Sequence, residues 1–377
     1  MSHRPVPIVL FGLGAIGRAV ARAALVDPGF RVVGAVDREP ALVGRSLAAL
    51  TRAPTLSSLK VRRELHQVPG RGKGRVLVHT AGSRLTTVFP QLEAILEAGY
   101  AVVSSCEELA WPWDDHPVLA RRLDRMARAA RSPIFATGVN PGFVMDLLPV
   151  VLTGVTRRIT AIRATRVVDA ATRRIPLQRK VGAGLPPPQF RSLVRQGRLG
   201  HVGLVNSARL IARAVGWKLD QVTTRVRPVL STGRHPGPVP VKAGAAAGLH
   251  QVVIGKCRAR EVIRLDLIMA IGAAEPHDRI QVHGAPPLDV TIRGGVPGDQ
   301  ATVAALLNAA FTAREAAHGL HTALDLPLPR AHLSARPLRR CRDAGAEARP
   351  DPGGGGGRPT RFPLKATERT SCRAPTP

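Results

Sequence analysis

The sequence predicts an α/β protein with a doubly wound parallel sheet in its first part and a second, α+β domain after it. Two observations support this fold class. Over residues 1–150, short apolar runs alternate with helical patterns, as they do in β-α-β units. A glycine-rich turn also joins the first apolar run to the first helical pattern, and parallel sheets of this kind bind ligands at such turns.

The first part contains five apolar runs of strand length, and apolar residues recur at helical spacing between several of them. A loop and a helix are expected after the fifth run, over Gly138–Leu148. We expect strands at Pro7–Phe11, Phe30–Val36, Arg75–His79, Ala101–Ser104 and Pro133–Thr137, and helices at Ile16–Leu25, Thr87–Ala98 and Pro117–Ala130.

The pattern changes after residue 150, where strand-like runs lie among helices and long Pro/Gly stretches. A helix is expected at Pro297–Ala317, and five consecutive glycines mark the tail. We therefore predict domains at 1–150 and 151–297, a segment 298–330 whose helix returns to the first domain, and a disordered basic tail at 331–377. The strands expected in the second domain are Ile159–Val168, Leu249–Ile254, Val262–Ile271 and Leu288–Ile292.

Composition limits the function classes. The 55 Lys and Arg outnumber the 26 Asp and Glu, which gives a formal net charge of +29, as expected of a nucleic-acid binder. However, the basic residues are spread along the whole chain and aromatic residues make up only 3%, so stacking platforms for bases are scarce. Solvated basic faces are therefore favoured over specific nucleic-acid binding.

No apolar run reaches the roughly 18 residues that a membrane span needs, and a strand begins almost at the N-terminus. We expect no membrane segment, no signal peptide and a cytoplasmic location. The cysteines form neither a disulfide framework nor a metal pattern, and no cluster has the spacing of metal ligands, so no metal is predicted. These cysteines are Cys106, Cys257, Cys341 and Cys372.

The glycine-rich turn predicts a dinucleotide site of the Rossmann type. Gly12 allows the tight turn, Gly14 lets the backbone approach a pyrophosphate, and Gly17 lets the helix pack close to the strand. The phosphates then lie at the helix N-terminus, where free N–H groups and the helix dipole favour an anion. The residues expected to contact the cofactor here are Gly12, Leu13, Gly14, Ala15, Ile16 and Gly17.

Asp37 ends the second strand, twenty residues after Gly17. A carboxylate at this position can accept the ribose 2′-hydroxyl and repel a 2′-phosphate, which favours NAD, whereas Arg38 could instead hold a 2′-phosphate, so NADP stays open. Small residues after the third strand, Thr80 and Ala81, would let the dinucleotide pass close to the backbone. The preceding His79 is expected to be a structural histidine.

The fourth strand leads into two adjacent carboxylates, Glu107 and Glu108. A carboxylate beside a nicotinamide could act as general acid/base or stabilise a cationic iminium. Acidic residues are also common in the first turn of a helix, and the spacing alone does not decide between these interpretations. Ser105 and Cys106, just before them, are expected at the cofactor, and Cys106 is expected to pack rather than to react.

A loop follows the fifth strand. The amide of Asn140 can both donate and accept hydrogen bonds, and ligands gather at the carboxyl ends of such strands, so we expect Asn140 at the cofactor. The alternative is an Asn that caps a turn.

These residues lie within strings that resemble the 2,4-diaminopentanoate dehydrogenase-like family, which includes the native NAD(P)H-dependent amine dehydrogenases and is related to dihydrodipicolinate reductase. The resemblance covers about residues 5–330. The strings that carry it are SSCEELAWPW (104–113), ATGVNPGFVMDLLP (136–149), RVVDAATRRIPLQRKVGAGL (166–185), GHVGL (200–204), EVIRLDL (261–267) and GDQATVAALLNA (298–309).

The resemblance implies a Rossmann domain, a second domain that forms the substrate pocket and the contact of a homodimer, and oxidoreduction at a C–N bond. It places the essential glutamate of the family at Glu107, where related homoserine dehydrogenases carry a lysine, with Glu108 as the second choice. The expected reaction is the reversible reductive amination of a ketone or aldehyde with ammonia, through an iminium that is reduced by hydride.

Further residues complete the expected substrate pocket and its surroundings. A diamino acid substrate would need an Arg for its carboxylate, and Arg163, Arg166 and Arg179 are the candidates. His250 and Asp169 are expected to make structural hydrogen bonds. The apolar pocket is expected to be formed by Phe143, Val144, Met145, Val168 and Leu177.

Other functions stay open. A 2,4-diaminopentanoate dehydrogenase or a dihydrodipicolinate reductase-like imine or carbonyl reductase would use the same fold. A noncatalytic dinucleotide-binding or nucleic-acid-associated protein is the alternative from another class.

Overall fold

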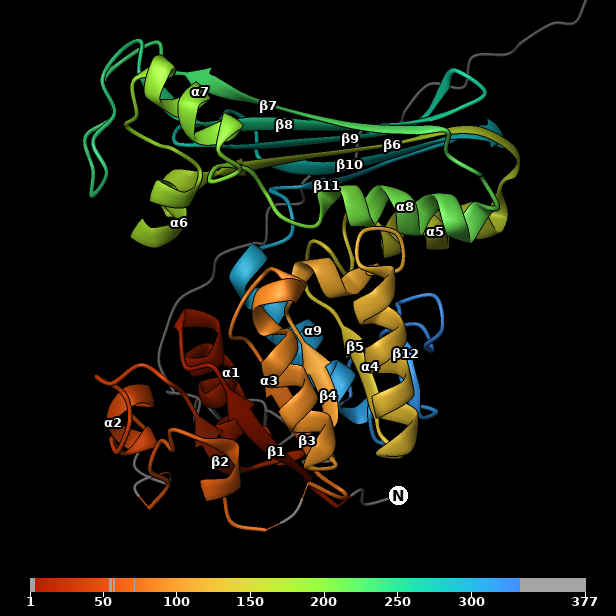
Figure 1. Cartoon of the computed structure of the whole chain (residues 1–377). Coiled ribbons are helices and arrows are strands. Elements are labelled where there is room, and N and C mark those ends of the chain that lie inside the picture. The colour runs from red at the N-terminus through yellow and green to blue at the C-terminus, as the bar shows by residue number, and fades with distance from the viewer. Residues whose placement is uncertain (1–3, 54–55, 57, 71, 333–377) are drawn as a thin grey trace, which may run out of the picture. The chain divides into compact units, whose positions relative to one another are not determined.

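The residues that the computed structural model describes, 4–53, 56, 58–70 and 72–332, form two six-stranded sheets (Figure 1). The expected α/β fold with a parallel sheet followed by a second sheet is confirmed. Most of the tail that we expected to be disordered, including Cys341 and Cys372, lies outside the described residues.

The first sheet is entirely parallel, with the strand order β12-β5-β4-β3-β1-β2. All five strands expected in the first part are present. The sixth, β12, was not expected, because three residues near the end of the described chain give no periodic signal. The strands are β1 Val6–Phe11, β2 Phe30–Val36, β3 Val76–His79, β4 Ala101–Ser104, β5 Pro133–Ala136 and β12 Gly319–His321.

Helices cover both faces of this sheet (Figure 1). Successive side chains of a strand point to opposite faces, so Ile8 and Leu10 of β1 belong to one core cluster, and Val9 and Phe11 belong to another. The three expected helices are present, while the five-residue α2 was not expected. The helices are α1 Ala15–Val26, α2 Leu47–Thr51, α3 Leu85–Glu97, α4 Pro117–Ala129 and α9 Gly298–Thr312.

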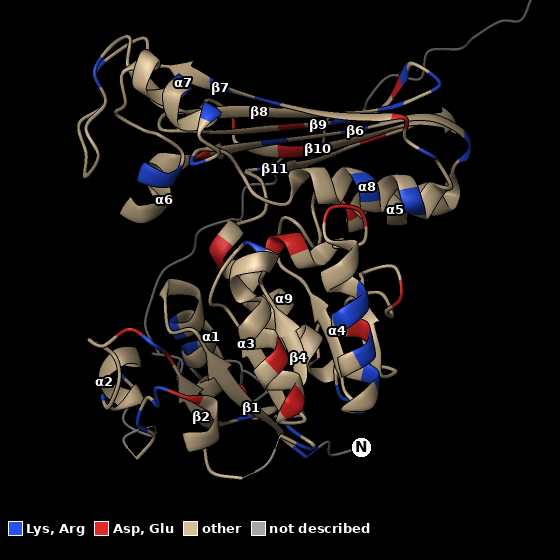
Figure 2. Ribbon diagram, in the orientation of Figure 1, with Lys and Arg blue, Asp and Glu red and all other residues tan. Residues whose placement is uncertain are grey.

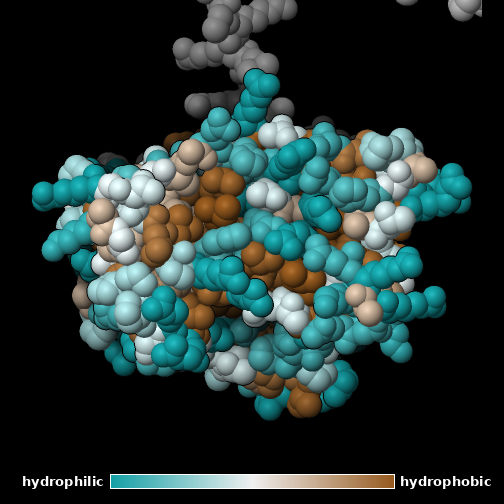
Figure 3. Space-filling model, turned by 90° about the horizontal axis from the view of Figure 1, so that it is seen from above, coloured by the Kyte–Doolittle hydropathy of each residue, from teal (hydrophilic) through white to brown (hydrophobic). Residues whose placement is uncertain are grey.

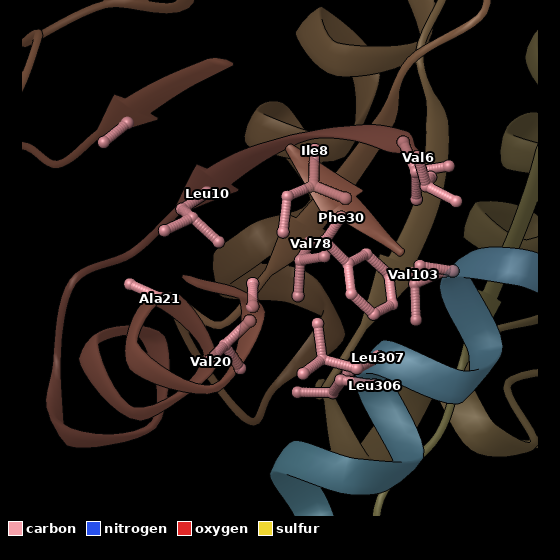
Figure 4. Close-up of a cluster of buried hydrophobic side chains, with 14 of the residues drawn as sticks. Val6, Ile8, Leu10, Val20, Ala21, Phe30, Val78, Val103, Leu306 and Leu307 are labelled. Atoms are coloured by element: carbon pink, nitrogen blue, oxygen red, sulfur yellow. The ribbon is translucent and has the colours of Figure 1, made fainter. Parts of the chain in front are cut away.

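Helix α9 follows the second sheet in sequence but packs on the first. Leu306 and Leu307 of α9 lie beside Val20 of α1, under Ile8 of β1 (Figure 4). The helix is shorter than the expected Pro297–Ala317. Because its N-terminus lies next to the second sheet and its body is part of the first core, α9 ties the two sheets together.

The second sheet has the order β11-β10-β6-β9-β8-β7 and is antiparallel apart from the β6–β9 pair. Three of the four expected strands lie within longer ones, and the expected Val262–Ile271 ends one residue past β9. Two strands were missed: β7 is an edge strand that buries none of its side chains, and β10 carries only two large apolar residues. The strands are β6 Arg157–Asp169, β7 Gln221–Leu230, β8 Ala246–Cys257, β9 Arg260–Ala270, β10 His277–Ala285 and β11 Leu288–Arg293.

One face of the second sheet packs on helices. Leu204, Ala208 and Ile211 of α8 (Leu204–Val215) form a core cluster with Val253 of β8. Farther along the sheet, Phe190 of α7 (Pro187–Arg195) is fully buried in a separate cluster. The helix expected within Gly138–Leu148 begins later than expected: residues 140–146 form turns, and α5 runs over Leu147–Leu152, because the Asp146 side chain accepts a hydrogen bond from the Leu147 N–H and caps it.

The other face of the second sheet carries apolar side chains among polar ones. On β8, His250, Val252 and Ile254 alternate with the buried Leu249 and Val253. Figure 3, which looks down on this part of the molecule, shows hydrophobic patches bordered by hydrophilic side chains. Basic residues are spread over helices and strands of both sheets in the view of Figure 2, consistent with a diffuse rather than a localised positive charge.

A buried ion pair joins β6 to β10. One terminal nitrogen of the Arg166 guanidinium donates to both carboxylate oxygens of Asp278 at 2.8 Å, and the other donates to the Val296 carbonyl at 2.6 Å. Asp278 also accepts from the Val296 N–H at 2.7 Å. The pair therefore fixes the segment that leads from β11 into α9.

Asp278→Asn leaves the buried Arg166 charge without its counterion, so we expect the free energy of unfolding to fall by about 3–5 kcal/mol. The exposed pair of Arg279 on β10 and Asp289 on β11 provides the control. Asp289→Asn should leave the stability almost unchanged, because water already screens that pair. Urea denaturation of the two variants measures the difference, and equal losses would contradict the account.

Candidate active site

A cavity of about 350 Å³ lies at the carboxyl edge of the first sheet, against segments of the second sheet. The carboxyl ends of parallel strands meet at one edge, which brings the loops after β3, β4 and β5 together. Side chains lining the cavity include Ile16, Thr80, Ser83, Ser105, Glu107, Thr137, Asn140, Arg166, Val168, Leu177, Lys180, His201, Met269 and Asp299.

The turn between β1 and α1 has the geometry of a phosphate-binding loop. Gly12 has φ +91°, and a Cβ there would come within 2.8 Å of the Thr80 carbonyl carbon. A Cβ at Gly17 would overlap the Gly12 carbonyl oxygen. A Cβ at Gly14 would meet no protein atom within 4 Å, so the packing of the protein does not explain this glycine. The open space at Gly14, in front of the α1 N-terminus, fits a bound pyrophosphate.

Asp37 lies at the end of β2 beside this turn. One of its carboxylate oxygens accepts the Leu13 N–H at 2.5 Å, and the other accepts the Glu39 N–H at 2.9 Å. The Arg38 guanidinium donates to the Glu64 carboxylate at 3.2 Å. Asp37 is therefore held beside the glycine turn, while Arg38 is already paired with an acid.

The structure separates the two adjacent glutamates after β4. Glu107 lines the cavity. Glu108 accepts the Leu85 N–H at 2.7 Å and lies 3.1 Å from the His116 Nε2 and 3.5 Å from Arg84. Glu108 therefore holds the start of α3, and Glu107 is the carboxyl group that a ligand in the cavity can reach.

Burial raises the pKa of Glu107, whereas the charge of Lys180 and a hydrogen bond with Ser83 oppose the rise. Removal from water disfavours the charged carboxylate, and a nearby cation favours it. Gly203, with φ +90°, lies against Glu107: a Cβ at Gly203 would come within 2.8 Å of the Glu107 Cβ. The chain before α8 thus closes over the glutamate because position 203 has no side chain.

Two polar atoms at the cavity have no hydrogen-bond partner among the described residues. They are the Oδ1 of Asn140 and the Nδ1 of His201, and both are buried. Burial, with the charges of Lys180 and Arg166, lowers the pKa of His201 to about 4, so its ring is neutral at physiological pH. Buried polar atoms without a partner are costly, so these two atoms suit a ligand that supplies hydrogen bonds.

Sequence reasoning missed His201 and Lys180 as site residues. Both lie within strings that carried the family resemblance, His201 in GHVGL and Lys180 in RKVGAGL. The resemblance was therefore the signal that could have identified them. Their place at the cavity depends on how the second sheet packs against the first, and the spacing of apolar residues in the sequence does not reveal this packing.

The structure corrects part of the expected pocket. Val144 and Met145 are buried in the core with α8 and do not line the cavity, because the turn after Pro141 directs them toward that helix. Phe143 lines a separate apolar cavity beside α9. Val168 and Leu177 do line the main cavity.

Other expected contacts are less direct. The Leu13 side chain is buried in the core, so only its backbone faces the turn. Cys106 is fully buried, its thiol donates to the Ser83 carbonyl at 3.3 Å, and burial raises its pKa to about 12, so it packs rather than reacts. Ser105 and Asn140 line the cavity, and Ala81 approaches the turn through its backbone, 2.9 Å from a Cβ at Gly12.

The polar residues that we expected to be structural have protein partners. The ring nitrogens of His79 lie 2.9 Å from the Ser104 hydroxyl and 3.0 Å from the Gln91 side chain. His250 lies 3.0 Å from Asp266. Asp169 accepts the N–H groups of Ala171 and Gly272.

Of the arginines considered for a substrate carboxylate, Arg163 and Arg179 are exposed outside the cavity lining, and Arg166 lines it but is paired with Asp278.

Within the described residues, no three His, Cys, Asp or Glu side chains are grouped as a metal site would require. No helix of the described part is long and apolar enough to cross a membrane.

The glycine turn, the acid after β2 and the half-buried glutamate at one sheet edge define the class: an NAD(P)-dependent oxidoreductase. Comparisons with known proteins give the family. The family model of the 2,4-diaminopentanoate dehydrogenase C-terminal domain matches residues 143–339. The chain therefore belongs to the 2,4-diaminopentanoate dehydrogenase family, as the resemblance predicted.

The alignments with relatives cover most of this chain and nearly all of each relative. A 2,4-diaminopentanoate dehydrogenase of Acetoanaerobium sticklandii is 30% identical over 334 residues, covering 86% of this chain and 94% of that protein. An amine dehydrogenase of Streptomyces virginiae is 26% identical, covering 85% of this chain and 96% of that protein. The solved amine dehydrogenase of Mycobacterium smegmatis shares the fold, with a TM-score of 0.78 at 22% identity over 88% of this chain and 98% of that one.

Alanine substitutions at two of the glycines should affect different properties, cofactor binding at Gly14 and stability at Gly17. Gly14→Ala adds a methyl group to open space, so it should leave the melting temperature unchanged but weaken NAD(P)H binding by at least about tenfold, or about 1.4 kcal/mol. Gly17→Ala should instead lower the melting temperature, because the methyl group overlaps the Gly12 carbonyl. Thermal denaturation and cofactor titration measure both effects, and undiminished cofactor binding by Gly14→Ala would contradict the assignment.

Proposed function

We propose that the protein catalyses the reversible reductive amination of a ketone or aldehyde with ammonia, using NAD(P)H, and the oxidative deamination of the amine in reverse. One observation carries the proposal. Glu107 is a half-buried carboxyl group that lines the cavity at the carboxyl edge of the first sheet, and its partial removal from water raises its pKa. Membership of a family whose named relatives act on amines supports the same reaction class.

The reaction balances as carbonyl compound, ammonia, NAD(P)H and a proton giving amine, water and NAD(P)⁺. Ammonia adds to the carbonyl carbon, and loss of water from the resulting carbinolamine leaves a cationic iminium. Glu107, as a carboxylate, first receives a proton from the added nitrogen and then gives it to the departing hydroxyl group, which leaves as water. As a carboxylate it then stabilises the iminium cation, and this attraction is stronger in a water-poor cavity than in bulk water.

A raised pKa suits this role, because a general acid works best when its pKa is close to the working pH. Lys180 keeps the pKa of Glu107 from rising further. The bound nicotinamide supplies the hydride in the reductive direction and accepts it in the other. The glycine turn, Asp37 and the loop at Thr80 would hold the dinucleotide, and Asn140, whose Oδ1 has no partner among the described residues, would contact its nicotinamide end.

NAD is the favoured cofactor in this proposal. The Asp37 carboxylate is held beside the turn, where it can accept a ribose hydroxyl and repel a 2′-phosphate. Arg38, the residue that could hold a 2′-phosphate, is already paired with Glu64.

We also propose a homodimer that is formed through the outer face of the second sheet. The apolar side chains of Val252 and Ile254 on this face, among charged ones, resemble the mixed character of protein interfaces. Light scattering on the purified protein tests this assignment, and a monomer at micromolar concentration would contradict it.

The function is tested by NADH and NADPH oxidation with a panel of ketones and aldehydes in concentrated ammonia at alkaline pH. We expect turnover that depends on ammonia and is faster with NADH. Turnover of the same strength without ammonia would instead indicate a carbonyl reductase.

Glu107→Gln keeps the size of the side chain but removes its ability to exchange protons. We expect kcat to fall by about 10²–10⁴-fold while NADH affinity changes little. Glu108→Gln is the matched control: it should lower stability at the start of α3 and leave kcat within about tenfold, because Glu108 does not line the cavity. Full amination activity in Glu107→Gln would exclude Glu107 as the acid/base.

A further inference from the structure

Helix α8 begins against two loops of the first sheet, the loop after β4 and the loop after β5. A Cβ at Gly203, the residue before α8, would come within 2.8 Å of the Glu107 Cβ and 2.5 Å of the Pro141 Cγ. Near the start of the helix, Asn206 and Ser207 are polar side chains that are almost fully buried. This end of α8 therefore contacts the site through its backbone and through two polar groups.

Asn206 holds the loop after β4. Its side-chain amide Nδ2 donates a hydrogen bond to the Trp111 carbonyl at 2.7 Å, and both residues are buried. Trp111 directly follows the single 3₁₀ turn Glu107–Ala110. One helix thus contacts this turn at both ends, because Gly203 packs on its first residue and Asn206 binds the carbonyl that follows its last.

Packing does not explain an asparagine at position 206. Asn is a poor helix former, and burying its amide without a partner costs free energy. The nearby α8 residues Leu204, Ala208 and Ile211 are buried in an apolar cluster, where another apolar side chain would suit position 206. The hydrogen bond to the Trp111 carbonyl is the contact that accounts for Asn206.

Arg209 contacts the same loop from farther along α8. Its guanidinium lies 3.8 Å from the Asp114 carboxylate and also pairs with Asp115. These three side chains are partly exposed, so water weakens their attraction. Asn206 provides the buried contact with a fixed direction.

We infer that Asn206 is a positioning residue for Glu107: by holding the Trp111 carbonyl, it fixes the turn from which the glutamate reaches the cavity. Asn206 does not line the cavity, so it acts through Glu107 and not on a ligand. The inference rests on the proposed function and adds that a helix of the second domain sets the geometry of the acid/base in the first. A displacement of about 1 Å in a reacting group can lower a rate by about 100-fold.

The test uses Asn206→Ala, which removes the donor, with NADH, ammonia and the carbonyl compound that the parent protein turns over fastest. We expect kcat to fall by about 10- to 100-fold, while the KM values for NADH and the carbonyl compound change by less than about threefold. Thr322→Val is the matched control, because it removes another buried hydrogen bond, from the Thr322 hydroxyl to Asp325 at 2.8 Å, outside the cavity lining. It should lower the melting temperature and leave kcat within about twofold.

A double-mutant cycle separates positioning from general damage to the fold. If Asn206 acts through Glu107, Asn206→Ala should lower kcat by less than about threefold when Glu107→Gln is already present. An equal fall in both backgrounds would overturn the inference, and so would a kcat within about threefold of the parent in Asn206→Ala alone. Asn206→Ser, whose hydroxyl is too short to replace the amide, takes the same test if Asn206→Ala does not fold.

Hydrogen–deuterium exchange tests the positioning without the reaction. Asn206→Ala should speed exchange of the backbone amides in residues 107–113 by at least about tenfold and leave those of β1 unchanged. Unchanged exchange in residues 107–113 would overturn the inference. Absence of ammonia-dependent turnover in the parent protein would instead count against the proposed function, and exchange alone would then decide whether Asn206 holds the turn.

Discussion

The buried carboxylate of Asp146 is the interaction on which the site depends. It is fully buried, and it accepts hydrogen bonds from the N–H groups of Gly142 and Leu147 and from the hydroxyl of Ser207, at 2.7–2.8 Å. Ser207 belongs to α8, so this carboxylate joins the loop after β5 to the helix beneath the second sheet. That contact brings Gly203 against Glu107 and closes the cavity above the edge of the first sheet.

The electrostatics of the cavity follow from this closure. Burial favours a neutral Glu107, and the charge of Lys180 acts in the opposite direction. Burial has the larger effect, so the pKa of Glu107 is raised, which suits the proton transfer that we propose. The arginines that line the cavity are paired with acidic side chains, Arg166 with Asp278, and Arg173 and Arg174 with Asp299.

Much of the first sheet could be predicted because its strands are short apolar runs and its turn chemistry is local. The range Phe30–Val36 was predicted to the residue, and the three glycines at 12, 14 and 17 have steric environments that match their expected roles. Strand β7 was missed because an edge strand rich in Arg and Thr lacks a buried pattern. Lys180 and His201 were missed because they reach the cavity through contacts between the two sheets, and Val144 and Met145 were misplaced for the same reason.

The central claim is that one cavity holds the nicotinamide and Glu107 together. A crystal structure with NADH bound would test it most directly. The account predicts the nicotinamide ring between Asn140 and Glu107. A nicotinamide ring outside this cavity would contradict it.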